Sequence, residues 1–149
     1  MSEHLGIGEL SVRTGRSIHA LRYYESMGLI PFVTRDPGGR RRYSEQHVEW
    51  LLFLDRLKRT GMTLSQMQEY ATLVSRGKQT LTERIELLHA HLERIDQQML
   101  ELASSRELLI AKIGFYDDWK STGKRPKSWW VDSPHLAAQA VPGLTKKAG

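Results

Sequence analysis

Residues 15–28 read GRSIHALRYYESMG, a short helical segment with a turn signal at each end. Ser17 is placed to cap a helix over residues 18–27, and the final glycine is placed to end it. A shorter helix is expected over residues 8–14, ending at Gly15. Two helices joined by a tight, glycine-containing turn predict a helix-turn-helix.

A small hairpin is expected next. Residues 36–39 read DPGG, a cluster typical of turns. The flanking stretches 29–33 and 40–43 are predicted to form its two strands. The arginines at 40–42 make its tip basic. They alternate between faces on a strand, so at most two of them address the same phosphate backbone.

Two more helices follow, each opened by a capping residue. Ser44 is placed to cap the first, and Thr63 forms a capping box with Gln66 at the start of the second. Apolar residues recur every three positions in both helices. The predicted buried stripes are Val48, Leu51, Leu54 and Leu57 in the first helix, and Leu64, Met67, Tyr70 and Leu73 in the second.

Residues 80–118 contain no proline, and their apolar positions advance by four and three alternately. A helix of roughly 55–60 Å extends beyond any core that so short a chain wraps around it. We therefore expect a second copy to cover it in an antiparallel coiled coil; packing along its own domain is the alternative. The predicted dimer seam is Leu81, Ile85, Leu88, Leu92, Ile95, Met99, Leu102, Arg106, Leu109 and Ile113.

Arg106 interrupts this apolar series, and an isolated buried charge is costly. In an antiparallel pair centred near residue 98 or 99, it would lie opposite the His91 region of the other copy. Glu86 and Glu93 of that copy are the expected acceptors. We expect Arg106 to fix the register and the specificity of the dimer.

The composition is that of a soluble globular protein, with 40% hydrophobic and 26% charged residues. Its net charge of +5 is uneven, since residues 1–78 carry +4, residues 79–117 carry −3 and residues 118–149 carry +4. A basic first block favours an anionic partner. No apolar run is long enough to span a membrane and no signal peptide is visible, so a cytoplasmic protein is expected.

The chain has no cysteine, which excludes disulfides, thiolate metal sites, iron-sulfur clusters and cysteine nucleophiles. No phosphate-binding loop and no nucleophile context is recognisable, so we expect neither catalytic residues nor a cofactor. Glu86, His89 and Glu93 share a helix face at metal-ligand spacing. A solvated polar face explains all three without a metal, and no metal is expected.

Several short motifs occur in a fixed order in the first half of the chain. They are IGEL at 7–10, TG at 14–15, LRYYE at 21–25, GLI at 28–30, GRRRY at 39–43 and LKRTGMTL at 57–64. In order and spacing they resemble the MerR family of bacterial transcription regulators. The resemblance is close over residues 6–76 and extends over 80–118 through a shared long dimerisation helix.

The resemblance implies a mainly α-helical fold: a winged helix-turn-helix DNA-binding domain over residues 1–76, a dimerisation helix over 79–118 and a short tail over 119–149. It implies that the second helix enters the major groove between two wings and that the long helices pair antiparallel. Such regulators bind promoters with an overlong spacer and activate them by bending and untwisting the DNA. The implied partners are double-stranded promoter DNA, a second copy, RNA polymerase and a small effector, at the bacterial nucleoid.

Side chains suited to DNA lie within these motifs. Arg22 offers a charged fork, and Tyr23 and Tyr24 offer phenolic hydroxyls, for phosphates and base edges. Alternatively, one tyrosine faces the core and Arg22 pairs with Glu25 or Glu9. The predicted DNA contacts are Ser17, His19, Arg22, Tyr23, Tyr24, Arg40, Arg41, Arg42, Tyr43, Lys58, Arg59 and Thr63.

Two arginines depart from the family pattern. Arg16 stands where an apolar residue is usual, and Arg40 where an aromatic residue is common. Each is expected to add charge near the DNA face and so to raise non-specific affinity, because phosphate contacts position a protein without specifying a sequence.

The effector is constrained by what is missing. Thiol-based sensing does not apply, and a large drug-binding domain does not fit after Trp119. The aromatic residues are Tyr116, Trp119, Trp129 and Trp130. They are expected to form either a pocket for an apolar or cationic molecule, or a cover over the end of the coiled coil or over the DNA-binding domain of the other copy.

These features predict a homodimeric regulator, not an enzyme, that binds a pseudo-palindromic promoter element, distorts it and responds to a small effector. A coiled-coil adaptor for other proteins, without specific DNA binding, is the alternative. It explains the long helix and leaves the ordered motifs without a purpose.

Overall fold

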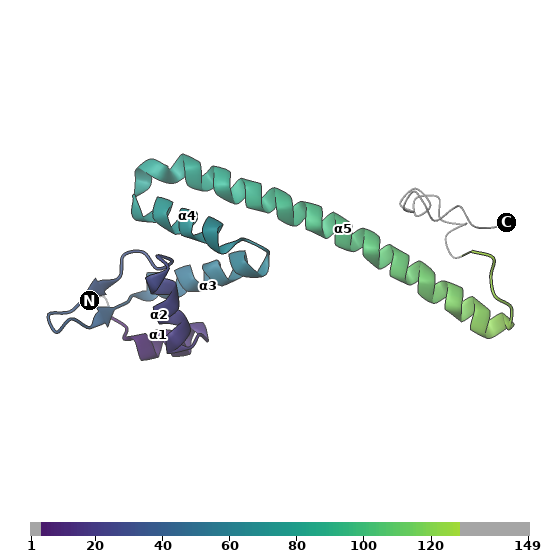
Figure 1. Ribbon diagram of the computed structural model, residues 1–149, viewed down its shortest axis with the longest axis horizontal. Coiled ribbons are helices and arrows are strands. Elements are labelled where there is room, and N and C mark those ends of the chain that lie inside the picture. Colours follow the sequence, from purple (N-terminus) through teal and green to yellow (C-terminus); the bar gives the residue numbers. More distant parts are fainter. Residues whose placement is uncertain (1–3, 129–149) are drawn as a thin grey trace. The chain divides into compact units, whose positions relative to one another are not determined.

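The computed structural model describes residues 4–128, and the chain forms two compact units, one ending at Glu93 and the other starting at Arg94. The described part is mainly helical, as predicted. Its elements are α1 (Ile7–Thr14), α2 (Ile18–Ser26), β1 (Thr34–Arg35), β2 (Arg41–Arg42), α3 (Glu45–Arg59), α4 (Leu64–Ser75), the 3₁₀ turn η1 (Lys78–Thr80) and α5 (Leu81–Thr122) (Figure 1).

The predicted helix-turn-helix is confirmed in α1 and α2. Gly15 ends α1 in the left-handed region at φ 67°, where a side chain is strained. The Ser17 hydroxyl then accepts the Ala20 N–H at 3.1 Å, which caps α2. This tight connection lets α1 pack against α2 and α3, and α2 buries Leu21 and Tyr24 in the same core.

The core lies between these helices and α3 and α4. The predicted stripe of α3, Val48, Leu51, Leu54 and Leu57, is buried as expected. The stripe predicted for α4 is partly wrong, because Leu64 is exposed and Ala71 is buried instead. Positions three apart advance about 300° around a helix, so a strict three-residue series drifts off the buried face.

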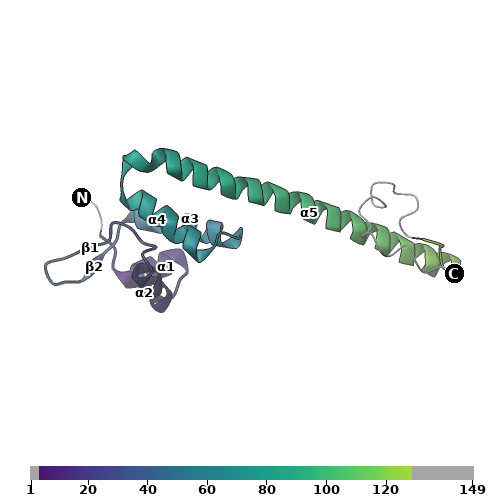
Figure 2. The same ribbon diagram turned by 45° about the horizontal axis from the view of Figure 1, so that its top comes forward.

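The hairpin is shorter than predicted. Thr34 pairs with Arg42 and Arg35 with Arg41 in an antiparallel pair, and the hairpin projects beside the helices of its unit (Figure 2). The strand expected over residues 29–33 does not form. Pro31 lacks an N–H to donate, and Phe32 adopts a positive φ of 61°. This stretch instead buries its first two residues in the core.

The junction of α4 and α5 is held by Arg84. Its guanidinium donates to the carbonyl oxygens of Leu73 at 3.3 Å and Val74 at 3.5 Å, and to that of Gly77. A cation that satisfies the last carbonyls of α4 complements that end of the helix. Thr80, almost fully buried, donates to the Leu73 carbonyl as well.

The long helix predicted from residue 80 is confirmed, and it extends to Thr122. Its first turns pack on the core of the first unit, where buried His91 lies 2.7 Å from the Thr60 hydroxyl. Among residues 4–128, no helix has the length and apolarity that crossing a lipid bilayer requires. Trp129 and Trp130 lie outside the described residues.

Candidate DNA interface

The exposed face of α2 carries side chains predicted to enter the major groove. His19, Arg22 and Tyr23 are exposed, and 48% of the Tyr23 surface is accessible. Tyr24 is only 7% exposed and lies in the core with Leu21. One tyrosine therefore faces outward and the other inward, as the alternative interpretation expected, and predicting Tyr24 as a DNA contact was wrong because its ring lies in the core. Within residues 4–128, Arg22 forms no ion pair with either glutamate considered for it.

The tip of the hairpin is organised by Asp36. Its Oδ1 accepts the Arg40 N–H at 2.9 Å, and its Oδ2 accepts from Arg42 Nη2 at 3.0 Å. The Arg40 N–H, together with the Arg42 guanidinium, holds the pKa of Asp36 below its usual value. Gly39 closes the turn with φ 78°. The ionised aspartate therefore shapes the tip and leaves the Arg40 side chain exposed.

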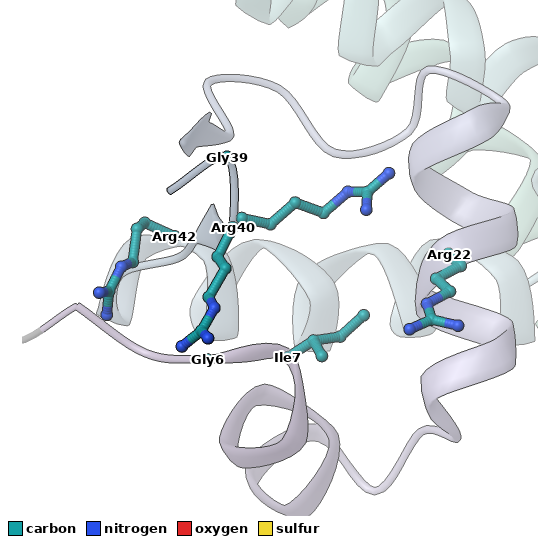
Figure 3. A pocket seen from close by; sticks show the side chains of 7 residues that line it. Gly6, Ile7, Arg22, Gly39, Arg40 and Arg42 are labelled. Atoms are coloured by element: carbon teal, nitrogen blue, oxygen red, sulfur yellow. The ribbon is translucent and has the colours of Figure 1, made fainter. Parts of the chain in front are cut away.

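A cleft of about 370 Å³ separates α2 from the hairpin. Arg22 lines one side, residues 39–42 line the other, and Gly6 and Ile7 lie at the start of α1 between them (Figure 3). Cationic side chains therefore reach this space from two elements. Such a cleft suits one strand of a phosphate backbone.

The base of the hairpin is fastened to α2 through Glu25. Arg41 Nε lies 2.7 Å from Oε1 and 2.6 Å from Oε2 of Glu25, and the Tyr43 hydroxyl donates to Oε2 at 3.2 Å. Burial, followed by the Glu25 charge, raises the pKa of Tyr43 to about 12. Predicting Tyr43 as a DNA contact was wrong for its side chain, which is fully buried because its ring fills the core.

Arg16 is part of an internal network. Its Nη2 lies 2.7 Å from Asp55 Oδ1, and its Nη1 donates to the Tyr24 hydroxyl at 2.7 Å. Only 14% of the side chain is exposed, and Asp55 also pairs with Arg59 at 2.8 Å. The expectation that Arg16 adds charge to the DNA face is therefore wrong, because a carboxylate on α3 neutralises it in a largely buried position.

The other predicted contacts occupy caps and helix ends. Ser17 and Thr63 are exposed N-cap residues, and the Thr63 hydroxyl accepts the Gln66 N–H at 3.2 Å. Lys58 and Arg59 are exposed in the last turn of α3. Lys58, Arg59 and Thr63 lie around the α3–α4 turn, whereas Ser17 lies at the start of α2, and none of the four lines the cleft between α2 and the hairpin.

The described residues hold no group of three or more histidines, aspartates or glutamates arranged to bind a metal. Glu86, His89 and Glu93 are all exposed on α5. They are placed as a solvated polar face would be.

Two family models match the chain. The model of MerR HTH family regulatory proteins matches residues 5–73, and the model described as MerR, DNA binding matches residues 48–111. An HTH-type transcriptional regulator of Haemophilus influenzae, described as uncharacterized, is 35% identical over 111 residues. That alignment covers 74% of this chain and 82% of the relative.

This chain belongs to the MerR family. The mercuric resistance operon regulatory protein of Bacillus cereus is 31% identical to it over 104 residues, covering 70% of this chain and 79% of that protein. The crystal structure of HiNmlR, a MerR family regulator lacking the sensor domain, bound to promoter DNA, matches with a TM-score of 0.70 and 32% identity. It covers 82% of this chain and 97% of the other.

The chain is therefore a DNA-binding transcriptional regulator of the MerR family and not an enzyme. The family assignment overturns the alternative of an adaptor without specific DNA binding.

The sequence did not predict how acidic side chains hold the arginines around this candidate DNA interface. Glu25, Asp36 and Asp55 each hold at least one arginine in place. Only Asp36 gave a local signal, because it begins a turn motif. Glu25 pairs with Arg41, 16 residues away, and Asp55 pairs with Arg16, 39 residues away, so no local pattern marks these two pairs, although Asp55 also pairs with Arg59 one helical turn away.

Proposed function

We propose that this MerR-family regulator acts as a homodimer that binds a pseudo-palindromic promoter element, distorts the DNA between the half-sites and responds to a small effector that is not sensed through thiols. RNA polymerase at the same promoter is the partner whose access the distortion changes. The observation that carries the dimer is the apolar seam of α5.

The seam is largely open to solvent in a single chain. Met99, Leu102 and Leu109 have 64%, 72% and 65% of their surface accessible. A row of exposed leucines and methionines at coiled-coil spacing is costly in water. A second α5, laid antiparallel, covers it, and Arg106 then sets the register against acidic side chains of the other copy.

The DNA contacts divide into readout and positioning. Arg22 and Tyr23 lie on the exposed face of α2, the element that we place in the major groove. Arg40 at the hairpin tip lies across the cleft and suits a phosphate. Lys58 and Arg59, in the last turn of α3, suit the backbone further along the duplex.

For the effector we propose the aromatic cluster near the end of α5. The Phe115 ring centroid lies 5.5 Å from that of Tyr116 and 6.1 Å from that of Trp119. Lys112 Nζ lies 4.8 Å from the Phe115 centroid and 5.0 Å from the Tyr116 centroid, so these ring faces already hold a cation. An apolar or cationic molecule fits this chemistry, and quenching of tryptophan emission that Trp119→Phe weakens would support it.

Two measurements test this proposal: the molar mass in solution tests the dimer, and a DNA footprint tests promoter binding. Light scattering should give twice the chain mass in solution. Selection of bound genomic fragments, followed by footprinting at near-physiological salt, should yield a protected pseudo-palindrome of about two helical turns between promoter elements. A monomer at micromolar concentration would overturn the dimer, and an absence of enriched fragments would overturn promoter binding by this chain alone.

A further inference from the structure

Glu25 is a largely covered carboxylate between the two elements that we propose to contact DNA, and this placement requires an explanation. It lies in α2 near the end of the helix, and its carboxylate neighbours the hairpin arginine Arg41. DNA carries a dense negative charge, so a carboxylate here weakens the general attraction to the duplex. A residue at this place must contribute something that outweighs the repulsion.

Glu25 connects α2 to the hairpin. Its two carboxylate oxygens receive Arg41 Nε at 2.7 and 2.6 Å, and Oε2 also receives the Tyr43 hydroxyl at 3.2 Å. Among residues 4–128, these contacts alone supply hydrogen bonds or ion pairs between α2 and the hairpin. Charge-assisted hydrogen bonds in a partly buried place are stronger than neutral ones.

The hairpin has little else to fix its position. Each strand is two residues long, and such a ribbon is marginally stable by itself. At its base, Tyr43 exchanges backbone hydrogen bonds with Leu5 at 2.9 and 3.0 Å. An open cleft separates the hairpin from α2, so the contacts of Glu25 are what connects the hairpin to that helix.

We propose that Glu25 is a positioning residue that fixes the distance between the recognition helix α2 and the hairpin, and therefore the spacing of Arg22 and Arg40 against one DNA backbone. The inference rests on the proposed contacts of α2 and the hairpin with DNA. It also gives Arg41 a different part from its neighbour Arg40: Arg41 holds the hairpin in place, and Arg40 meets the phosphate.

The direction in which one substitution changes DNA affinity distinguishes a positioning role of Glu25 from a purely electrostatic one. Glu25→Gln raises the net charge by one, so electrostatics alone predicts tighter binding to any DNA. Loss of positioning predicts weaker binding to the footprinted site, on the order of tenfold for one charge-assisted tie. Glu69→Gln is the matched control, because Glu69 is exposed on α4 and forms no hydrogen bond or ion pair within the described residues.

A second variant keeps the charge. Glu25→Asp shortens the side chain by one methylene, so it should also weaken binding to the site. The double variant Glu25→Arg with Arg41→Glu restores an ion pair of reversed polarity and should recover a large part of the affinity. Thermal melts check that each variant folds.

The decisive measurements are Kd for the footprinted site, the hydroxyl-radical footprint and amide exchange of residues 34–42. In Glu25→Gln we expect weaker binding, loss of the flanking protection with the central protection kept, and faster exchange in the hairpin. Binding as tight as or tighter than wild type, or unchanged exchange, overturns the inference. Failure of the wild-type chain to select any fragment would overturn promoter binding instead, and the exchange measurement still decides on Glu25.

Discussion

Arg16 and Asp55 form an ion pair of 2.7 Å in which the arginine side chain is 14% exposed. The pair joins the turn between α1 and α2 to the middle of α3, across 39 residues of sequence. Asp55 neutralises the charge of Arg16 inside the domain, so not every arginine of this basic domain is available to DNA. Arg40, exposed at the hairpin tip, is a suitable comparison.

Alanine at these two positions should therefore give opposite phenotypes. Arg40→Ala should flatten the dependence of log Kd on log salt by about one phosphate contact and leave the melting temperature unchanged. Arg16→Ala should keep the salt slope and lower the free energy of unfolding by about 1–3 kcal/mol, since Asp55 and the Tyr24 hydroxyl lose a donor. A flatter slope in Arg16→Ala would place that guanidinium on DNA after all.

Arg22 is expected to contribute specificity as well as affinity. Arg22→Ala should weaken binding to the footprinted site by about 1–3 kcal/mol and binding to random duplex by much less. Tyr23→Phe removes a hydroxyl from the same exposed face and should produce a smaller loss in the same direction. Equal loss on both DNAs would make Arg22 a phosphate contact, and full affinity in both variants would remove α2 as the recognition helix.

His47 makes stability depend on pH. The Ser44 N–H donates to Nδ1 at 3.0 Å, so Nε2 carries the proton and donates to the Pro31 carbonyl at 3.0 Å. Burial lowers the pKa of His47 below 6.5, so the folded chain binds this proton less readily than the unfolded chain. The free energy of unfolding should fall as pH drops below about 6.5, and the fall should stop below the folded pKa.

His47→Gln tests this assignment. Glutamine keeps an acceptor for the Ser44 N–H and does not titrate, so the variant should show a flatter dependence of unfolding free energy between about pH 7 and pH 5. Urea unfolding at several pH values measures it. The same slope as wild type would assign the pH dependence to another group.

The junction between α4 and α5 should respond to Arg84→Met. Methionine keeps most of the apolar stem and removes the donors to two carbonyl oxygens in the last turn of α4 and to that of Gly77, which follows the helix. The free energy of unfolding should fall by about 1–3 kcal/mol. Lys78→Met, at an exposed lysine beside the same junction, should change it little.

The seam of α5 offers a matched pair for the proposed dimer. Leu102 and Leu100 have 72% and 67% of their surface exposed in a single chain, but only Leu102 lies on the predicted seam. Leu102→Glu should shift the molar mass from dimer to monomer and weaken binding to a two-fold site. Leu100→Glu should do neither. Equal behaviour of the two variants would contradict the assigned seam.

Local signals in the sequence predicted the elements well. Caps such as Ser17 and Thr63 act within three residues, and the buried stripe of α3 repeats within one helix, so a short window contains all that specifies them. The strand expected at 29–33 failed because Pro31 and the positive φ of Phe32 overrode an apolar run.

The candidate interface was predicted less completely, because several of its side-chain contacts join residues that are far apart in the sequence. Arg22 and Arg40 were predicted as DNA contacts and are exposed, but the helix pattern did not tell which of Tyr23 and Tyr24 faces outward. Whether Arg16 and Arg41 are available to DNA depends on carboxylates elsewhere in the chain, with which they form ion pairs. A sequence shows how many arginines it has, but which of them are neutralised is settled only when α2, α3 and the hairpin come together.

The base of α5 is held at two points about two turns apart. Arg84 grips the end of α4, and His91 contacts Thr60 at the end of α3. Because α3 and α4 are both fixed to this one stretch of helix, the base of α5 cannot rotate about its axis independently of them. We expect a torque applied further along α5 to rotate the helix-turn-helix and its hairpin together as a rigid body.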